Sequence, residues 1–179
     1  MIYFTSDLHF GHTNIIMHSK RPFLGVTEMN DGLIERYNSV VTNKDDVYIL
    51  GDVAFCDPTP LVARMNGRKH LIMGNHDHPK KSKLHGCAFQ WIKDTYELSV
   101  NGQKIWLAHY PHRAWPNSHH GAWHLYGHSH GNMPPHGRSM DVGVDVWGYY
   151  PVSFENIQTE MARLGAADIN HHEKATHDR

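Results

Sequence analysis

Gly74-Asn75-His76-Asp77 follows the apolar run His70-Leu71-Ile72-Met73, and this junction decides the fold. A short apolar run bounded by turn residues is typical of a buried strand. Asparagine, histidine and aspartate at its end are costly to bury in a core and well suited to a site. Four other stretches have the same form, an apolar run that ends in potential ligand residues. They are residues 2–6 before Asp7-Leu8-His9, residues 47–50 before Gly51-Asp52, residues 105–108 before His109, and residues 123–126 before Gly127-His128-Ser129-His130.

The order of the predicted elements indicates an α/β fold. The first half alternates strands and helices, which favours parallel strands joined by crossover helices. The second half is mainly strands, and Asn101-Gly102-Gln103 between two apolar-rich runs is typical of a hairpin turn. We therefore expect a sheet-on-sheet core with helices outside. The predicted strands are 2–6, 46–50, 69–73, 97–100, 104–108, 123–126 and 140–146, and the predicted helices are 15–18, 27–41 with Thr27 as its cap, 60–65, and 154–164 with Ser153 as its cap.

The composition is that of one globular domain. The chain has 179 residues, of which 40% are hydrophobic and 20% are charged, and this length allows a sizeable core. We expect a single domain over residues 1–165 and a polar, flexible tail over residues 166–179. The net charge of −1 with neutral histidines gives no basic field for a nucleic-acid duplex or a membrane surface.

The sequence also predicts a cytoplasmic protein without membrane contact. No apolar run approaches the roughly 18 residues that a membrane span needs. No basic segment precedes the first strand, as it would in a signal peptide. Cys56 and Cys87 lie far apart in the sequence and suggest no disulfide framework. The sequence does not indicate an oligomeric state.

The candidate ligands come from all five strand ends. Sites in open α/β sheets form beyond the carboxyl ends of the strands, and carboxylate, imidazole and amide groups suit a divalent transition metal. Seven residues are too many for one tetrahedral site. If one aspartate bridges, they give each of two ions about four protein contacts, and two ions roughly 3.5–4 Å apart can act together on a phosphate ester. The seven candidates are Asp7, His9, Asp52, Asn75, His109, His128 and His130.

These blocks, in this order between residues 7 and 130, closely resemble the five signature blocks of the calcineurin-like metallophosphoesterases. Each block is short, but five of them in the right order at predicted strand ends make chance a poor explanation. The resemblance implies a four-layer αββα sandwich, in which two mixed β-sheets are flanked by helices. It also implies that one metal is held by Asp7, His9 and His130, a second by Asn75, His109 and His128, and both by a bridging Asp52.

The activity implied by the resemblance is metal-dependent hydrolysis of phosphate esters, by a phosphodiesterase or a phosphatase acting on small or nucleotide substrates. A metal-bridging hydroxide would attack phosphorus, His76 would protonate the leaving alkoxide as general acid, and Asp77 would orient His76. A positioned imidazole contributes roughly 10²–10⁴-fold to such a step. Oxygen and nitrogen ligands admit Mn, Fe, Zn, Ni or Co, so the sequence does not identify the metal.

Several residues near the blocks have two interpretations each. Arg113 has the fork that clamps phosphate oxygens, or it is a solvated surface residue. His12 contacts substrate, or it only structures its loop. Asp141 and Asp145 share a predicted strand face and could hold ligand histidines from behind. A solvated face is expected for Lys80, Lys81 and Lys83.

Three other functions fit the sequence less well. A non-catalytic binding module on the same scaffold would be expected to lack some ligands or His76, whereas this chain has all of them. A protein phosphatase would be expected to carry an extended insertion to grip a protein, and none is evident. A histidine-rich metal buffer accounts for the 18 histidines but not for the aspartates and the asparagine at strand ends.

Overall fold

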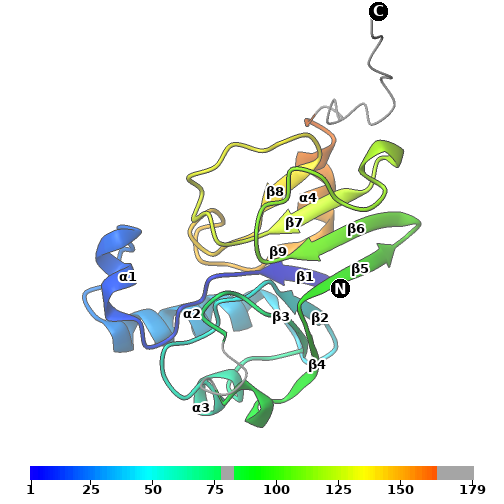
Figure 1. Ribbon diagram of the computed structural model, residues 1–179. Helices are drawn as coiled ribbons and strands as arrows, with labels where there is room; N and C mark the ends of the chain where they lie inside the picture. Colours follow the sequence, from blue (N-terminus) through cyan, green and yellow to red (C-terminus); the bar gives the residue numbers. More distant parts are fainter. Residues whose placement is uncertain (78–82, 165–179) are drawn as a thin grey trace, which may run out of the picture.

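Two β-sheets pack against each other in the computed structural model, which describes residues 1–77 and 83–164 (Figure 1). The first sheet has the strand order β4-β3-β2-β1-β9, and the second has the order β5-β6-β7-β8. The predicted fold class, an α/β fold of two mixed sheets with helices, is confirmed. Lys80, Lys81 and the predicted tail over residues 166–179 lie outside the described residues, whereas Lys83 is exposed and pairs with Asp57.

The first sheet is parallel except at one edge. Four strands run parallel, β1 (Ile2–Thr5), β2 (Asp46–Ile49), β3 (Arg68–Ile72) and β4 (Phe89–Lys93), and β9 (Val152–Ser153) pairs antiparallel with β1. The side chains of β2 and the residue after it alternate between two apolar clusters. Val47 and Ile49 belong to one cluster, and Tyr48 and Leu50 to the other. Burial on both faces explains why this strand is a continuous apolar run.

The second sheet begins with the predicted hairpin. β5 (Thr95–Val100) and β6 (Gln103–Ala108) pair antiparallel, and Asn101 and Gly102 between them both have the positive φ that tight hairpin turns require. β7 (Trp123–Tyr126) and β8 (Ser139–Asp141) continue the sheet in parallel. Ile105, Leu107 and Leu125 join the cluster that contains Tyr48 and Leu50, so this cluster is the core between the two sheets.

The long helix α2 (Val26–Val40) covers the outer face of the first sheet (Figure 1). Its buried residues Met29, Leu33 and Tyr37 share a cluster with Val47 of β2. The predicted cap is wrong, because the helix begins at Val26 and its N-cap is Gly25, which makes no side-chain bond. The shorter elements on this side are α1 (Thr13–His18), α3 (Thr59–Val62) and a 3-10 turn, η1 (Leu84–Gly86).

The helix α4 (Phe154–Met161) begins where the sequence predicts. The Asn156 amide donates to the Ser153 hydroxyl at 3.2 Å, which is the expected N-cap bond. Phe154 and Ile157 belong to the core between the sheets. None of the helices in the described ranges is long and apolar enough to cross a membrane.

Two strands escape prediction, and a third is shorter than predicted. β4 has only partly buried or exposed residues, so its sequence lacks a continuous apolar run. β9 has two residues, too few for a pattern. β8 ends at Asp141 although the alternation continues to residue 146. The chain turns there, and the Val146 amide donates to the Gly143 carbonyl at 3.0 Å.

The outer face of β6 and β7 is covered by the loop of residues 109–122, and His124 is buried beneath this loop. Its Nδ1 bonds to the Trp106 carbonyl at 3.1 Å, and its Nε2 accepts from the His112 amide at 2.9 Å. Trp115 is buried and packs against the same ring. Burial lowers the pKa of His124 to about 4, since a second proton would break the bond from His112.

We expect mild acid to destabilise the protein through His124. The unfolded ring takes up a proton near pH 6.5, but the folded ring does so only near pH 4. Its contribution is therefore complete above pH 6.5 and is lost as the pH falls toward 4, by about 2 kcal/mol between pH 7 and pH 4.5. Urea unfolding at these two pH values measures the loss. His124→Gln should lose less than the exposed control His120→Gln, and equal losses would contradict the assignment.

Candidate metal centre

The seven predicted ligands lie where β1, β2, β3, β6 and β7 end. Backbone hydrogen bonds hold the loops after these strands together. The Asp7 amide donates to the Gly51 carbonyl at 3.0 Å, and the Gly127 amide donates to the His109 carbonyl at 2.9 Å. Parallel strands end at the same edge of a sheet, so residues that follow them in the sequence become neighbours in space. The structure brings together Asp7, His9, Asp52, Asn75, His109, His128 and His130.

The first group of ligand atoms comes from Asp7, His9 and His130, as the resemblance implies. His9 Nε2 lies 3.7 Å from Asp7 Oδ1, and His130 Nε2 lies 3.9 Å from the same oxygen. One ligand atom from each of the three residues lies within 4.8 Å of the other two. Such a spacing leaves room for an ion between them.

The second group comes from Asp52, His109 and His128, and Asn75 adjoins it. His109 Nε2 lies 3.0 Å from Asn75 Oδ1 and 3.6 Å from Asp52 Oδ2. Asp52 Oδ2 also lies 3.7 Å from His9 Nε2 of the first group. One oxygen of Asp52 therefore faces both groups, which is the position that a bridging ligand needs.

Buried atoms without partners show that the first group fits a cation. Within the described residues, Asp7 Oδ1 and both ring nitrogens of His9 are buried and have no hydrogen-bond partner. Leaving such atoms unpaired costs roughly 1–3 kcal/mol each, so native proteins rarely do it without a reason. A divalent ion would satisfy Asp7 Oδ1 and one nitrogen of His9 at once. The oxygen and nitrogen donors of both groups suit the predicted transition metals.

The backbone is strained where it presents these ligands. Five of the seven residues have φ in the left-handed region, which few non-glycine residues adopt and which aspartate and histidine tolerate better than most. Strain of this kind persists only where the surrounding structure imposes it, and it clusters at functional sites. The φ angles are 58° at Asp7, 52° at His9, 54° at Asp52, 64° at His128 and 47° at His130.

Glycines let the ligand loops approach one another. A Cβ at Gly74 would overlap the carboxylate of Asp52, and a Cβ at Gly127 would overlap the side chains of Ser6 and Asp7. Both glycines stand directly before ligand residues in their blocks. Any larger residue at these positions would push the strand ends apart. The two glycines therefore allow the loops that carry the candidate ligands to lie close together.

Each of the two ligand carboxylates is bound on one side by a backbone amide. The His128 amide donates to Asp7 Oδ2 at 2.9 Å, and the His76 amide donates to Asp52 Oδ1 at 2.9 Å. Burial would raise the pKa of Asp7, but the His9 ring and the nearby histidines hold that pKa below its ordinary value. The carboxylate is therefore kept ionised, with Asp7 Oδ1 left to face the first group.

A buried arginine supports the first group from behind. The guanidinium of Arg21 donates to both oxygens of Asp145 at 2.8 Å and to the Asp7 carbonyl at 2.7 Å. Asp145 Oδ2 in turn bonds to His130 Nδ1 at 2.7 Å. Burial would raise the pKa of Asp145, but His130 and Arg21 hold it below its ordinary value. Asp145 thus bonds to a candidate ligand histidine, as the sequence suggested, whereas nothing in the sequence around Arg21 indicated its part.

We expect Asp145→Asn to weaken metal binding by about tenfold, since removal of a ligand's hydrogen-bonded carboxylate typically costs 10–100-fold. The amide keeps the size of the side chain but loses the charge that holds Arg21 and His130. Titration against a competing chelator measures the affinity. Asp31→Asn is the matched control, because Asp31 also pairs with an arginine but on the surface. An unchanged affinity in Asp145→Asn would contradict the supporting role.

The carboxylate of Asp77 binds backbone amides. It accepts from the amides of Asp52 at 2.7 Å, Val53 at 2.9 Å and Gly74 at 2.9 Å. These bonds fasten the loop after β2 to the loop after β3. The role of Asp77 in orienting the His76 ring stays a prediction. Asp141 has a similar task, since it accepts from the Ser129 hydroxyl at 2.6 Å and the Gly131 amide at 3.0 Å on either side of His130.

His76 lies at the mouth of the site. Its side chain is 45% exposed, and its Nε2 lies 4.0 Å from Asp52 Oδ2. The exposed ring of Phe55 stands beside it, with the two ring centroids 4.6 Å apart. On the other side, the exposed ring of Tyr110 lies 4.5 Å from the His128 ring. The sequence singled out neither Phe55 nor Tyr110, because a lone aromatic residue in a loop carries no signal of its own.

The two predicted substrate contacts differ in position. The His12 ring lies 5.5 Å from the His9 ring, at the edge of the first group. Arg113 is exposed and lines a hollow of about 270 Å³ with Tyr126 and Pro135, and none of the seven ligands lines that hollow. The contact of His12 with substrate stays a prediction. The clamp role of Arg113 also stays a prediction, without a contact to support it.

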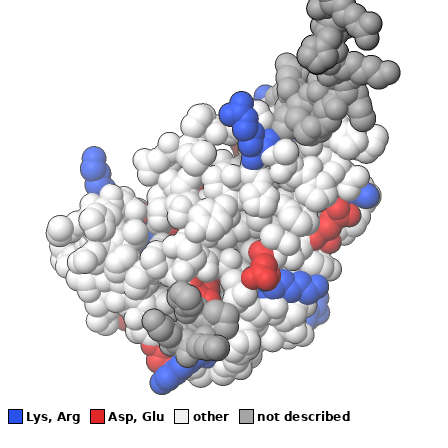
Figure 2. Space-filling model, viewed as in Figure 1, with Lys and Arg blue, Asp and Glu red and all other residues white. Residues whose placement is uncertain are grey.

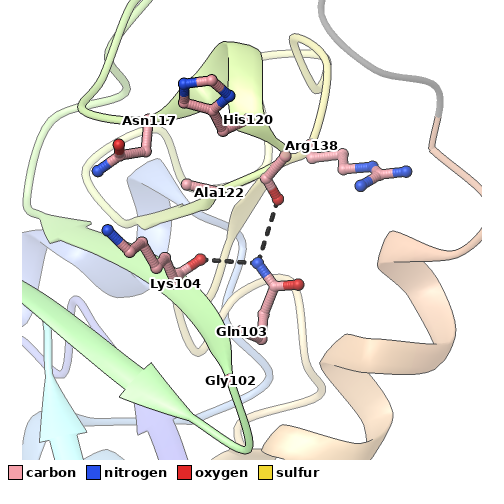
Figure 3. Close-up of a pocket in the computed structure, with 8 residues that line it drawn as sticks. Gly102, Gln103, Lys104, Asn117, His120, Ala122 and Arg138 are labelled. Atoms are coloured by element: carbon pink, nitrogen blue, oxygen red, sulfur yellow. Dashed lines mark hydrogen bonds between the residues drawn. The ribbon is translucent and has the colours of Figure 1, made fainter.

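Another hollow, of about 430 Å³, lies beside the hairpin and away from the ligands (Figure 3). The Gln103 side-chain amide donates there to the carbonyls of Lys104 at 2.8 Å and Gly121 at 3.1 Å. The guanidinium of Arg138 points away from it. Figure 2 shows isolated charges of both signs on the face viewed, without a continuous basic stripe. None of the seven candidate ligands lines the hollow in Figure 3.

The chain resembles other proteins over most of its length, although no protein-family model matches it. The uncharacterized protein MJ1445 of Methanocaldococcus jannaschii is 38% identical over 168 residues, which cover 87% of this chain and 88% of that protein. The Gene 66 protein of Mycobacterium phage L5 is 29% identical over 82% of this chain and 87% of its own length. A solved structure, the protein of unknown function AQ665 from Aquifex aeolicus, has 27% identity and a TM-score of 0.71, and the match covers 89% of this chain and 98% of that one.

Proposed function

Since this chain belongs to the family of the Methanocaldococcus jannaschii protein MJ1445 and has the two-sheet fold and ordered ligand blocks of the calcineurin-like metallophosphoesterases, we propose that it hydrolyses phosphate esters with two divalent metal ions. One observation carries the proposal. Asp52 Oδ2 lies 3.7 Å from His9 Nε2 and 3.6 Å from His109 Nε2, so a single carboxylate oxygen adjoins both ligand groups. The unpartnered Asp7 Oδ1 and His9 nitrogens support it.

The two ions would be held by the residues already described. Asp7, His9 and His130 would hold the first, Asn75, His109 and His128 the second, and Asp52 both. When bound, such ions lower the pKa of a water toward about 7 and neutralise the charge that develops on phosphoryl oxygens. The buried side chains of Asp7, His9, Asp52 and His109 exclude bulk water from one side of the site.

His76 would supply the proton that the leaving alkoxide needs. The His76 ring belongs to neither ligand group and is exposed at the mouth of the site. Its Nε2 lies 4.0 Å from the Asp52 carboxylate. A ring in this place can reach both the ester oxygen and solvent, from which it recovers its proton. Asp77 would keep the loops of Asp52 and Gly74 at a fixed spacing through its three amide bonds.

A small phosphoester is the substrate that fits best, whether a diester or a monoester and with nucleotides included. His128 is exposed and His76 is 45% exposed, so the mouth is open toward solvent. Manganese, iron, cobalt, nickel and zinc all suit the donors, and we retain manganese as the first metal to try. The cytoplasmic location likewise stays a prediction.

The test is a panel assay on protein stripped of metal. Each of Mn, Fe, Co, Ni, Zn and Mg is added back, and bis-p-nitrophenyl phosphate, p-nitrophenyl phosphate and 2′,3′- and 3′,5′-cyclic nucleotides serve as substrates. Elemental analysis gives the number of ions bound in each case. We expect turnover of at least one ester with two ions bound. Two bound ions without turnover of any ester would instead favour a binding module on the same scaffold.

A further inference from the structure

Phe55 is a large apolar residue that the fold places at the mouth of the metal centre and leaves 44% exposed. Its position is fixed by the backbone. The Phe55 amide donates to the Phe10 carbonyl at 2.8 Å, and Phe10 and Ala54 form a parallel bridge just before it. Exposed apolar side chains are common singly, so exposure alone would mean little. The Phe55 ring lies beside both His12 and His76, whereas the exposed ring of Tyr110 lies beside His109 and His128.

One face of the Phe55 ring is stacked on His12. The two centroids are 3.9 Å apart, and the planes are inclined by 20°. His12 in turn stands beside the ligand His9, with their centroids 5.5 Å apart. The phenyl ring therefore lies beside the rings of His12 and His9, with 5.5 Å between the Phe55 and His9 centroids, while the residue stays 44% exposed. A rigid, half-exposed ring loses little entropy when a second planar group stacks on it.

The ring also stands next to the expected proton donor. The centroids of Phe55 and His76 are 4.6 Å apart. In an ester whose leaving oxygen is within hydrogen-bonding distance of His76, Phe55 is within reach of the atoms beyond that oxygen. Phe55 is therefore placed to contact the leaving group.

We propose that Phe55 is a stacking platform for a planar ring of the leaving group, so that the substrates are phosphate esters of nucleosides. This inference depends on the proposed function for the direction of the substrate. A purine or pyrimidine ring suits the platform, because stacking between a base and an aromatic side chain is worth ~1–3 kcal/mol and tolerates any base. An aliphatic alcohol would leave the exposed ring without a partner.

Binding measurements on the metal-loaded protein test the platform apart from hydrolysis. Isothermal titration compares the phosphonate analogues of adenosine 5′-monophosphate and ribose 5-phosphate, in which a CH₂ group replaces the ester oxygen so that neither can be hydrolysed. The two probes differ only in the base. The wild type should bind the nucleotide analogue about 5- to 100-fold more tightly. Phe55→Leu should lose this preference and keep its affinity for the analogue without a base, and Phe55→Trp should restore the preference. Tyr150→Leu is the matched control, since Tyr150 is exposed to a similar extent at 42% and lies on another surface, near Phe23 and Arg36.

Several outcomes would overturn the platform. These are equal affinities of the wild type for the two probes, no binding of either, or a preference that survives in Phe55→Leu. A Phe55 that merely supports His76 would slow turnover in Phe55→Leu without changing the preference for the base. If the panel assay detects no hydrolysis but the preference for the nucleotide depends on Phe55, the proposed function fails while the binding site stands.

Discussion

Asp52→Asn should lose both metal ions and reduce hydrolysis by about a thousandfold or more. It removes a charge that adjoins both ligand groups, and the stabilisation that the ions provide is worth several kcal/mol. Asparagine tolerates the left-handed φ of 54° at this position. Its side-chain oxygen can still accept from the His76 amide as Asp52 Oδ1 does. The variant should therefore fold, and the loss should be one of metal and not of structure.

Elemental analysis and thermal unfolding with and without added metal give the answer. In the wild type, metal should raise the unfolding temperature, because binding to the folded state alone stabilises it. In Asp52→Asn this rise should disappear while the unfolding temperature without metal stays close to that of the wild type. Asp57→Asn is the control, since Asp57 is an exposed aspartate in the same loop that pairs with Lys83. Retention of two ions by Asp52→Asn would refute the bridging role.

His76→Ala should keep both ions and lose activity according to the leaving group. Alkoxides need a proton to depart, so hydrolysis of an alkyl diester should fall by roughly 10²–10⁴-fold. p-Nitrophenolate departs without one, so hydrolysis of bis-p-nitrophenyl phosphate should fall much less. The side chain is 45% exposed, so its removal leaves no cavity in a packed core.

Rates on the two esters, together with metal content, check this prediction. His120→Ala serves as the control, because His120 is exposed beside the hairpin and is remote from the ligands. An unchanged rate on the alkyl diester in His76→Ala would remove His76 from the mechanism. Equal losses on both esters would show that His76 does something other than protonate the leaving group.

The position of the candidate ligands at strand ends could be predicted, because it depends on sequence patterns. A run such as 47–50 is apolar since it is buried on both faces, and the residue after it must lie at a strand end. Asp145 was also predictable as a partner for a histidine of these blocks, and it bonds to His130.

What could not be predicted depends on contacts between distant segments. Arg21 stands in an irregular connection, and only the folded chain brings it to Asp145, 124 positions away. Asp77 follows His76 in the sequence, which suggested a direct partnership, but the tertiary fold turns its carboxylate toward the amides of Asp52 and Val53. β4 was not predicted, because it is an edge strand whose residues are only partly buried or exposed, so its sequence shows no alternation of apolar and polar residues.

The amide bonds to the two carboxylates restrict how each can bind an ion. With Asp7 Oδ2 held by the His128 amide and Asp52 Oδ1 by the His76 amide, one oxygen of each remains to bind a cation. Neither carboxylate is then free to chelate side-on, as carboxylates often do around calcium, which takes 6–8 oxygen ligands. Four of the seven donors are imidazoles as well. The centre should therefore discriminate against calcium even at a large excess, and in favour of smaller ions with fewer ligands.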